Sequence, residues 1–270
     1  MPLEAVFTED PAEALRVGRT HLYSDPILHN LILTLLAARI ENPRPGRYWV
    51  VKDGSEPVGV GFQSPITFFA SVTRMSREAA SVLAEAMSRF DAPGVNGEAA
   101  TSAAVAGRWT ELRSCACKPT FAGRIYEFFP LHRPETDCLR PATLEDRDLM
   151  ETWFEDFSNE IGEPQTFTPE IVERVVGAGQ AFIWDDGRPR SLACVTAPVA
   201  NVTRVQRVYT PPEQRNKGFA TLCVSALSNL MKDRGLRCIL YTDLANRTSN
   251  SVYRKVGYRA VAEVTRYEFF

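Results

Sequence analysis

The second half of the chain alternates apolar and polar positions in a pattern that predicts short strands interleaved with helices. A short strand at 138–140 precedes a capping box from Thr143 to Asp146, and the helix that follows is apolar on one face. Thr168-Pro169 begins a second helix. Continued to the end of the chain, the pattern predicts the order β, αα, β, β, β, α, β, α, β, β for residues 138–270.

The first half shows related features. Residues 47–64 predict a hairpin with its turn at Asp53-Gly54, and a second hairpin turns at Asp186-Gly187, about 133 residues later. A period of this length favours duplicated domains over a solenoid. We therefore expect a first domain over residues 1–134 and a second over residues 138–270, joined by a polar linker that contains a proline.

The strand expected over residues 201–210 breaks the usual alternation. Val202, Val205 and Val208 are each three residues apart, so a strict period of two would turn Val205 to the opposite face of the sheet. One extra residue in this strand restores the phase, which predicts a β-bulge. A twisted, partly exposed strand is the alternative.

The composition limits the classes of protein to which the chain can belong. The 31 Lys and Arg residues against 33 Asp and Glu residues give a formal net charge of −2, so no basic surface points to a nucleic acid. The longest apolar segment, residues 31–40, is interrupted by polar side chains and is too short to cross a bilayer. The first residues carry acids and no basic stretch, which argues against a secretory signal. We expect a cytoplasmic protein with neither membrane nor nucleic-acid partners.

The six cysteines favour thiols packed in the core. Cys194, Cys223 and Cys238 fall within apolar strand or helix patterns. Cys115 and Cys117 form a Cys-x-Cys pair, but no second pair and no nearby histidine completes a metal site. We therefore predict no metal centre and a reducing environment.

A turn with many potential anion ligands joins the strand that ends at Thr210 to a helix that begins near Gly218. After a Pro-Pro corner, the turn offers consecutive backbone N–H groups and the cations Arg215 and Lys217. Unpaired N–H groups at the start of a helix, together with the helix dipole, attract phosphate. The turn is therefore a candidate phosphate site.

Two motifs resemble those of the GCN5-related N-acetyltransferases. Arg215-Asn-Lys-Gly-Phe-Ala220 fits the pattern (Arg/Gln)-x-x-Gly-x-(Gly/Ala) and resembles the pyrophosphate loop of that family. About thirty residues later, Asn246-x-x-Ser-Asn-x-x-Tyr253 and the corner at Gly257-Tyr258 resemble its second motif. The resemblance covers roughly residues 138–270 and implies an α/β (α+β) fold, as in bacterial two-domain members. Each of the two domains is then expected to contain a mixed, mostly antiparallel central sheet flanked by helices.

The resemblance implies an acetyl-CoA-dependent N-acetyltransferase whose C-terminal domain binds the cofactor. The implied cofactor-binding residues lie on the strand end, the turn, the helix start and the second motif, namely Val208, Tyr209, Thr210, Gln214, Arg215, Asn216, Lys217, Gly218, Phe219, Ala220, Thr221, Asn246, Ser249 and Tyr253. Tyr253 is implied to be the catalytic acid, because a phenol with an ordinary pKa near ~10 keeps its proton until a thiolate leaves. Simple core packing of Tyr253 and simple helix capping by Ser249 are the alternatives. We expect a small-molecule or peptide amine as acceptor, and a monomer or homodimer.

The general base does not follow from the sequence. Many relatives place a glutamate on the strand before the loop, where this chain has Thr203, Arg204, Gln206 and Arg207. Four carboxylates remain as candidates for the base, namely Glu160, Glu163, Glu213 and Asp243. Two other functions also stay open. One is transfer from a different acyl-CoA, and the other is a non-catalytic, CoA-binding regulatory protein.

The first half is expected to have lost the cofactor site. Ser76 caps a predicted helix where the second half has its loop, yet no glycine lies between Gly61 and Gly94. A side chain at every turn position obstructs the close approach of a pyrophosphate. The alternative is a working first site with an unrecognised loop.

Overall fold

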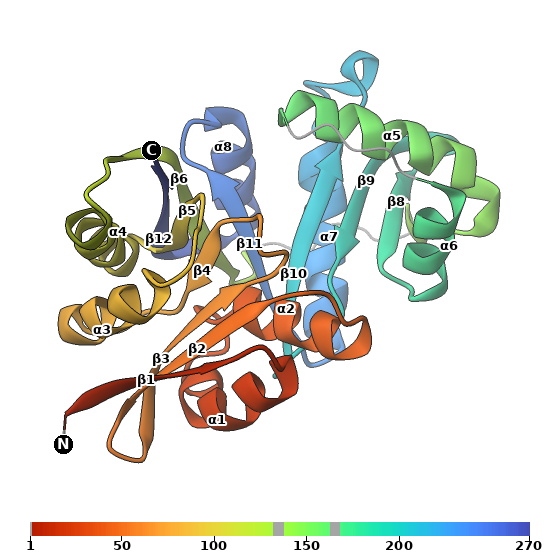
Figure 1. Ribbon diagram of the computed structural model, residues 1–270. Helices are drawn as coiled ribbons and strands as arrows, with labels where there is room; N and C mark the ends of the chain where they lie inside the picture. The colour runs from red at the N-terminus through yellow and green to blue at the C-terminus, as the bar shows by residue number, and fades with distance from the viewer. Residues whose placement is uncertain (1, 132–137, 163–167) are drawn as a thin grey trace. The chain divides into compact units, whose positions relative to one another are not determined.

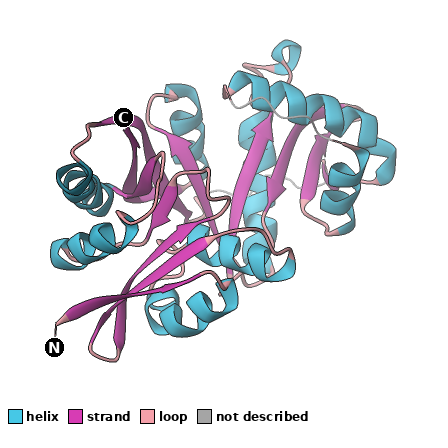
Figure 2. Ribbon diagram, viewed as in Figure 1, coloured by secondary structure: helices cyan, strands magenta, loops and turns pink. Residues whose placement is uncertain are grey.

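The computed structural model describes residues 2–131, 138–162 and 168–270, and the chain divides into two compact units. Unit 1 comprises Met1–Ile125, Asp243–Ala245 and Val261–Phe270, and unit 2 comprises Tyr126–Thr242 and Asn246–Ala260. Each unit contains a mixed, mostly antiparallel set of strands with helices packed against it (Figure 1, Figure 2). This architecture confirms the predicted fold class.

Unit 1 is built on six neighbouring strands and part of a seventh. Its elements in chain order are β1 (Leu3–Thr8), α1 (Pro11–Ser24), α2 (Asn30–Glu41), β2 (Arg47–Asp53), β3 (Glu56–Gln63), β4 (Ala70–Val72), α3 (Arg77–Met87), β5 (Gly94–Glu98), α4 (Ala99–Arg113), part of β6 (Cys117–Phe128) and most of β12 (Tyr258–Phe269). The strand order is β1-β2-β3-β4-β5-β12, with β6 beside β12. Strand β4 pairs with β5 in parallel, and the pairs β1–β2, β2–β3, β3–β4 and β5–β12 are antiparallel. The predicted hairpin of residues 47–64 is confirmed as β2 and β3.

Helices pack on both faces of these strands. Trp49 of β2 lies in one hydrophobic cluster with Leu83 of α3 and Trp109 of α4. On the opposite face, α1 comes so close that a Cβ added to Gly18 would lie 2.9 Å from a methyl group of Val60. Glycine at this position therefore allows α1 to lie directly on β3.

The last strand of the chain completes the sheet of unit 1. Residues Val264–Glu268 of β12 pair antiparallel with residues 94–98 of β5. The ring of Phe269 stacks on Trp109 with the ring centroids 4.8 Å apart and 7° between the planes. Unit 2 thus differs from the expected second domain of residues 138–270, because the final ten residues fold with unit 1. Backbone pairing of β12 with β5 links segments far apart in the chain, and the local residue pattern does not encode that partner.

Unit 2 contains the two sequence motifs. Its elements are β7 (Leu139–Pro141), a 3-10 turn (Leu144–Asp146), α5 (Arg147–Glu160), α6 (Pro169–Gly177), β8 (Ala181–Asp185), β9 (Pro189–Val195), β10 (Val202–Tyr209), a second 3-10 turn (Pro212–Gln214), α7 (Phe219–Asp233), β11 (Arg237–Asp243) and α8 (Arg247–Val256). The strand order is β11-β10-β9-β8-β7, with β10 and β11 parallel and the other pairs antiparallel. The predicted element order is confirmed as far as α8. One strand, β12, then follows where two were expected, because residues 258–269 contain no glycine or proline to turn the chain.

Successive residues of β8 face different helices. Phe182 and Trp184 belong to a core cluster with residues of α7 and α8, whereas Ile183 packs in a second cluster with α5 and α6. This alternation is the pattern of a strand buried on both faces. Helix α5 therefore covers one face of unit 2 and α7 the other.

Two observations bear on the environment expected from the sequence. All six cysteines are free, and burial raises the pKa of Cys194, Cys223 and Cys238 to about 12, as expected for thiols in the core. Within the described residues, no helix combines the length and the apolar character that crossing a membrane requires.

Candidate functional site

Strand β10 carries a bulge near its end. Its pairing with β9 runs from Val205 opposite Val195 to Gln206 opposite Cys194, and then jumps to Tyr209 opposite Leu192. Three steps along β10 therefore match two steps along β9. Arg207, in the middle of the irregularity, has a positive φ of 48°, which is uncommon for a residue with a side chain. The β-bulge predicted from the valine spacing is confirmed.

Beyond the bulge, β10 and β11 part. Their parallel register covers Val202 opposite Arg237 to Val205 opposite Leu240. Strand β10 nevertheless continues to Tyr209, and β11 continues to Asp243 (Figure 1). The end of β10 thus has an edge on the β11 side that the register with β11 does not cover.

The end of β10 is held from the β9 side. The hydroxyl of Ser191 in β9 donates a hydrogen bond of 2.9 Å to the carbonyl of Tyr209. Successive residues of a strand direct their backbone groups to opposite edges. The backbone of Val208 therefore faces the open edge, where an extended ligand can pair with it as an added strand does.

The turn after β10 presents a row of unpaired amides. The N–H groups of Gln214 and Arg215 bond to the carbonyls of Pro211 and Pro212 at 2.9 and 3.2 Å, inside the 3-10 turn. Those of residues 216–221 have no hydrogen-bond acceptor within the described part of the chain. The amides that a phosphate can use therefore begin at residue 216, whereas the residues implied by the resemblance begin in the turn at Gln214.

Gly218 gives the turn its shape. It has φ +85° at the N-cap of α7, and a Cβ built on it meets no atom within 4 Å. The left-handed backbone there favours glycine, and the open space leaves the N-terminus of α7 accessible to a ligand. The amide of Leu222 bonds to the Gly218 carbonyl at 3.0 Å and begins the helix. The dipole of α7 thus adds to the attraction of the free amides for an anion.

Both cations of the turn have partners. The guanidinium of Arg215 forms an ion pair with Glu160 at the end of α5, and its Nε donates to the carbonyl of Thr210 at 2.9 Å. The Nζ of Lys217 donates to the carbonyl of Glu213 at 2.9 Å. Arg215 therefore connects the turn to α5.

Helix α8 brings the second motif to the same unit. The side chain of Asn246 caps α8 by accepting the amide of Ser249 at 2.9 Å. Asn246 is thus the cap, and the capping role considered for Ser249 is wrong. Burial raises the pKa of Tyr253 to about 12, and a hydrogen bond with Ser249 acts in the opposite direction. The Tyr253 phenol therefore keeps its proton at neutral pH.

The corner after α8 explains the Gly-Tyr pair. Gly257 has φ +113°, and an added Cβ would lie 2.3 Å from the carbonyl of Phe129. The amide of Phe129 bonds to the Gly257 carbonyl at 3.0 Å. The buried Tyr258 follows, with its ring centroid 6.0 Å from that of Tyr253. This close backbone contact accepts only glycine at 257, and it fixes the end of the helix that carries Tyr253.

Comparison with known proteins agrees with this geometry. Residues 193–267 match the family model described as FR47-like protein. A GNAT-family acetyltransferase from Colwellia psychrerythraea superposes with a TM-score of 0.63 at 12% identity, over 100% of both chains. A GCN5-related N-acetyltransferase from Sphaerobacter thermophilus gives 0.63 at 14% identity, over 98% of this chain and 95% of that chain. A tandem GNAT protein from the clavulanic acid biosynthesis pathway gives 0.59 at 13% identity, over 99% and 98%. The search of curated proteins finds no matching sequence.

The chain has the fold of the GCN5-related N-acetyltransferases. The resemblance stated from the motifs is thereby confirmed, and the FR47-like match spans β9 to β12 and includes both motifs. Acetyltransferases of this GNAT fold use acetyl-CoA as the acyl donor. The residues of unit 2 fit such a cofactor, because its pyrophosphate suits the free amides of residues 216–221 at the start of α7.

The four carboxylates considered as the general base differ in their contacts. Glu160 is paired with Arg215 of the turn, and Glu213 is exposed in the 3-10 turn. Asp243 accepts the amide of Ala245 at 2.8 Å. Glu163 lies outside the described residues. Glu160 is thus the candidate whose carboxylate contacts the turn after β10, through Arg215.

Sequence reasoning missed Asp156. Its Oδ2 accepts a hydrogen bond of 3.0 Å from the hydroxyl of Tyr209. A signal was present, because Asp156 and Glu160 are four residues apart near the C-terminus of α5, where the helix dipole disfavours acids. Acids at this end of a helix suggest partners elsewhere in the fold, and the structure supplies Tyr209 and Arg215.

The segment from β4 to α3 in unit 1 differs from the segment from β10 to α7 in unit 2. Strand β4 pairs in parallel with β5 up to Val72, its last residue, so the two strands do not part within β4. Two amides near the turn that follows are bonded to side chains. The amide of Met75 bonds to Thr101 Oγ1 at 3.2 Å, and Ser76 caps α3 through the amide of Ala79 at 3.2 Å. These contacts are consistent with the prediction of a degenerate first half.

Proposed function

We propose that the chain is an acetyl-CoA-dependent N-acetyltransferase that binds its cofactor in unit 2 and acetylates an amine. One observation carries the proposal. The bulged end of β10, with an edge not covered by β11, leads directly into the row of free amides at residues 216–221. An elongated ligand with amides at one end and phosphates at the other suits both features. The acceptor we propose is a small-molecule or peptide amine.

Different groups of unit 2 bind different parts of the cofactor. The amides of residues 216–221 and the dipole of α7 hold the pyrophosphate, with the Thr221 hydroxyl at the same helix start. The backbone of Val208 pairs with the pantetheine arm. Arg215 and Lys217 add positive charge beside the phosphates. The bound cofactor supplies an acetyl thioester as the acyl donor.

Tyr253 is the residue that we assign as the acid. Its Oη retains a proton at neutral pH because burial raises its pKa to about 12. A protonated phenol beside the reacting sulfur can donate that proton as the thiolate departs. The capped helix α8 and the corner at Gly257 hold the ring in place. Loss of the hydroxyl is therefore expected to slow turnover and to leave cofactor binding nearly unchanged.

Thiol release with a panel of primary amines tests the proposal. Tyr253→Phe is expected to lower kcat by about a hundredfold, while the Kd for acetyl-CoA stays within about twofold of the wild type. Tyr23→Phe, at a part-exposed tyrosine of α1, is the matched control and should keep full activity. Equal, negligible thiol release from wild type and Tyr253→Phe would contradict the proposed enzymatic activity. The alternative of a non-catalytic, CoA-binding regulatory protein would then be favoured. The same assay with longer or acidic acyl-CoA in place of acetyl-CoA shows which acyl donor the protein prefers.

A further inference from the structure

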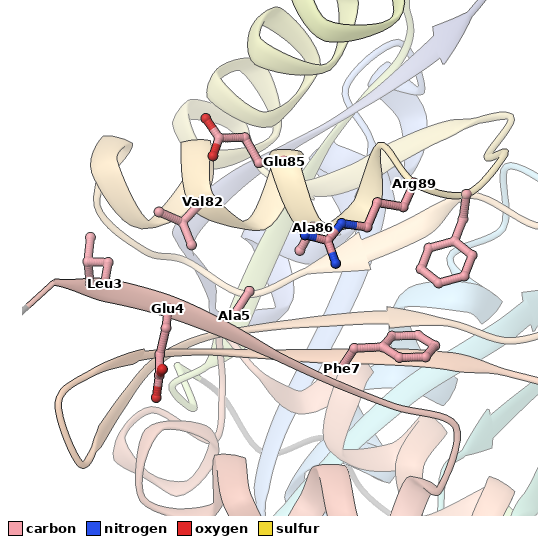
Figure 3. Close-up of a pocket in the computed structure, with 9 residues that line it drawn as sticks. Leu3, Glu4, Ala5, Phe7, Val82, Glu85, Ala86 and Arg89 are labelled. Carbon is pink, nitrogen blue, oxygen red and sulfur yellow. The ribbon is translucent and has the colours of Figure 1, made fainter.

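A groove of about 320 Å³ lies in unit 1 between the edge strand β1 and helix α3 (Figure 3). Strand β1 directs Leu3 and Ala5 toward the helix, and α3 contributes Val82 and Ala86. These four side chains are only partly buried, and all of them pack against the core cluster of unit 1. Apolar side chains thus line part of the groove on both sides, and its volume is at the lower end of the range of small-molecule sites.

One end of the groove is aromatic. The rings of Phe7 and Phe90 stack with their centroids 4.9 Å apart and 28° between the planes. Phe7 keeps 41% of its surface exposed, which is a large fraction for a phenylalanine in a strand. The guanidinium of Arg47 lies 4.6 Å from the centroid of Phe90. This end thus combines open aromatic surface with positive charge.

A second guanidinium enters the groove without a neutralising acid. Figure 3 shows the side chain of Arg89 directed into the space between α3 and β1. Arg89 lies in the turn that follows α3, and Glu85, near the end of that helix, is the acid that lines the groove from the same side. Glu85 turns away and bonds to Arg108 of α4, with Oε1 2.6 Å from Nη2. Within the described part of the chain, no carboxylate forms an ion pair with Arg89.

Glu4, the other acid beside the groove, does not pair with Arg89 either. Glu4 contributes to the lining from β1, but its side chain points away from α3 in Figure 3. Alternation along the strand places it on the face opposite Ala5. The groove therefore offers apolar side chains on both sides, an aromatic end and the exposed guanidinium of Arg89, which forms no ion pair within the described residues.

We propose that this groove binds a small carboxylate with an aryl or alkyl body. The carboxylate pairs with Arg89, and the apolar body lies along β1 and α3 against Phe7. A guanidinium matches a carboxylate with two parallel hydrogen bonds, which makes the charged end of the ligand specific. The site lies entirely in unit 1, so it gives that unit a ligand of its own. It does not depend on the acetyltransferase activity proposed for unit 2.

Calorimetric titration of the full chain with 4-phenylbutyrate tests the proposal, with 4-phenylbutan-1-ol as the neutral probe of matched shape. We expect the wild type to bind the carboxylate at least about tenfold more tightly than the alcohol. Arg89→Gln should remove that preference. Arg77→Gln, at an exposed arginine that begins α3 and does not line the groove, should retain it. Neither change removes a buried side chain, so both variants are expected to fold.

A second variant tests the location of the site. Ala86→Trp places a large side chain in the groove and should abolish binding of both probes. Three results would overturn the proposal: no saturable binding of 4-phenylbutyrate to the wild type, a preference that survives Arg89→Gln, or binding that survives Ala86→Trp. All of these experiments measure binding to the groove of unit 1, and none of them depends on acetyltransferase activity in unit 2.

Discussion

The hydroxyl of Tyr209 donates a hydrogen bond of 3.0 Å to Oδ2 of Asp156, which ties the last residue of β10 to helix α5. Tyr209 is only 3% exposed, and its ring lies 5.9 Å from that of Trp153 on the same helix. Burial and the carboxylate raise the pKa of Tyr209 well above its ordinary value, so the hydroxyl stays a donor. With Ser191 holding its carbonyl, Tyr209 is fixed from two sides. The backbone of Val208 is thereby held toward the open edge.

This contact predicts a measurable coupling between α5 and β10. Tyr209→Phe is expected to lower the free energy of unfolding by about 1.5 to 3 kcal/mol, because a hydrogen bond to a charged group is lost. A double-mutant cycle with Asp156→Ala should give a coupling energy of similar size in urea unfolding. Coupling near zero would show that the two side chains do not depend on each other. Tyr23→Phe serves as a control for removal of a part-exposed hydroxyl.

The ion pair between Arg215 and Glu160 predicts that the acid restrains cofactor binding. Both side chains are largely exposed, at 40% and 45%, so the pair itself contributes little to stability. Glu160→Gln frees the Arg215 charge for a phosphate, and the affinity for acetyl-CoA should rise about two- to fivefold. Glu155→Gln removes an equal charge from the same helix and should have a smaller effect. Weaker binding by Glu160→Gln would mean that the acid supports the site.

A buried histidine and a half-buried one beside it predict a loss of stability in acid. The rings of His21 and His29 lie 4.6 Å apart, and His21 Nε2 is 2.9 Å from Thr73 Oγ1. Burial, with a smaller effect of the His29 charge, lowers the pKa of His21 to about 4, and burial also lowers that of His29. The folded state thus binds fewer protons than the unfolded chain. The stabilisation is complete above about pH 6.5 and is lost as the pH falls toward 4.

Urea unfolding of wild type and His21→Gln between pH 7 and pH 4 measures this effect. Over that window the wild type should lose about 1 to 2 kcal/mol more than the variant, after allowance for the part of the ring that solvent reaches. Glutamine can keep a hydrogen bond to Thr73 but does not titrate. Parallel pH profiles for the two proteins would contradict a role for His21.

Much of unit 2 could be predicted because local signals coincide with tertiary structure. The capping box at Thr143, the spacing of the three valines in β10 and the glycine at 218 each mark a feature that the structure contains. Helix α1 received no prediction, although its buried Ala14, Gly18 and Leu22 recur every four residues. That spacing is typical of one buried face of a helix, so the sequence contained a signal for α1.

The features that escaped prediction are contacts between distant residues. The pairing of β12 with β5 joins segments more than 150 residues apart, and no local pattern specifies it. The bond between Asp156 and Tyr209 likewise depends on α5 covering β10. The involvement of the Gln214 and Arg215 amides in a 3-10 turn could not be foreseen from a Pro-Pro corner alone. The sequence therefore identified the turn between β10 and α7 as the candidate phosphate site. Only the fold shows which backbone amides of that turn are free.

Calorimetric titration of acetyl-CoA into wild type, Gly218→Glu and Gly235→Glu tests the location of the cofactor most directly. Gly235 follows the other end of α7 with φ +79° and equally open surroundings, so both changes strain the backbone alike. Only the change at 218 places a carboxylate beside the free amides. We predict one site per chain in wild type and Gly235→Glu, and its loss in Gly218→Glu. Two sites per chain, or binding that survives Gly218→Glu, would contradict a single cofactor site at the start of α7.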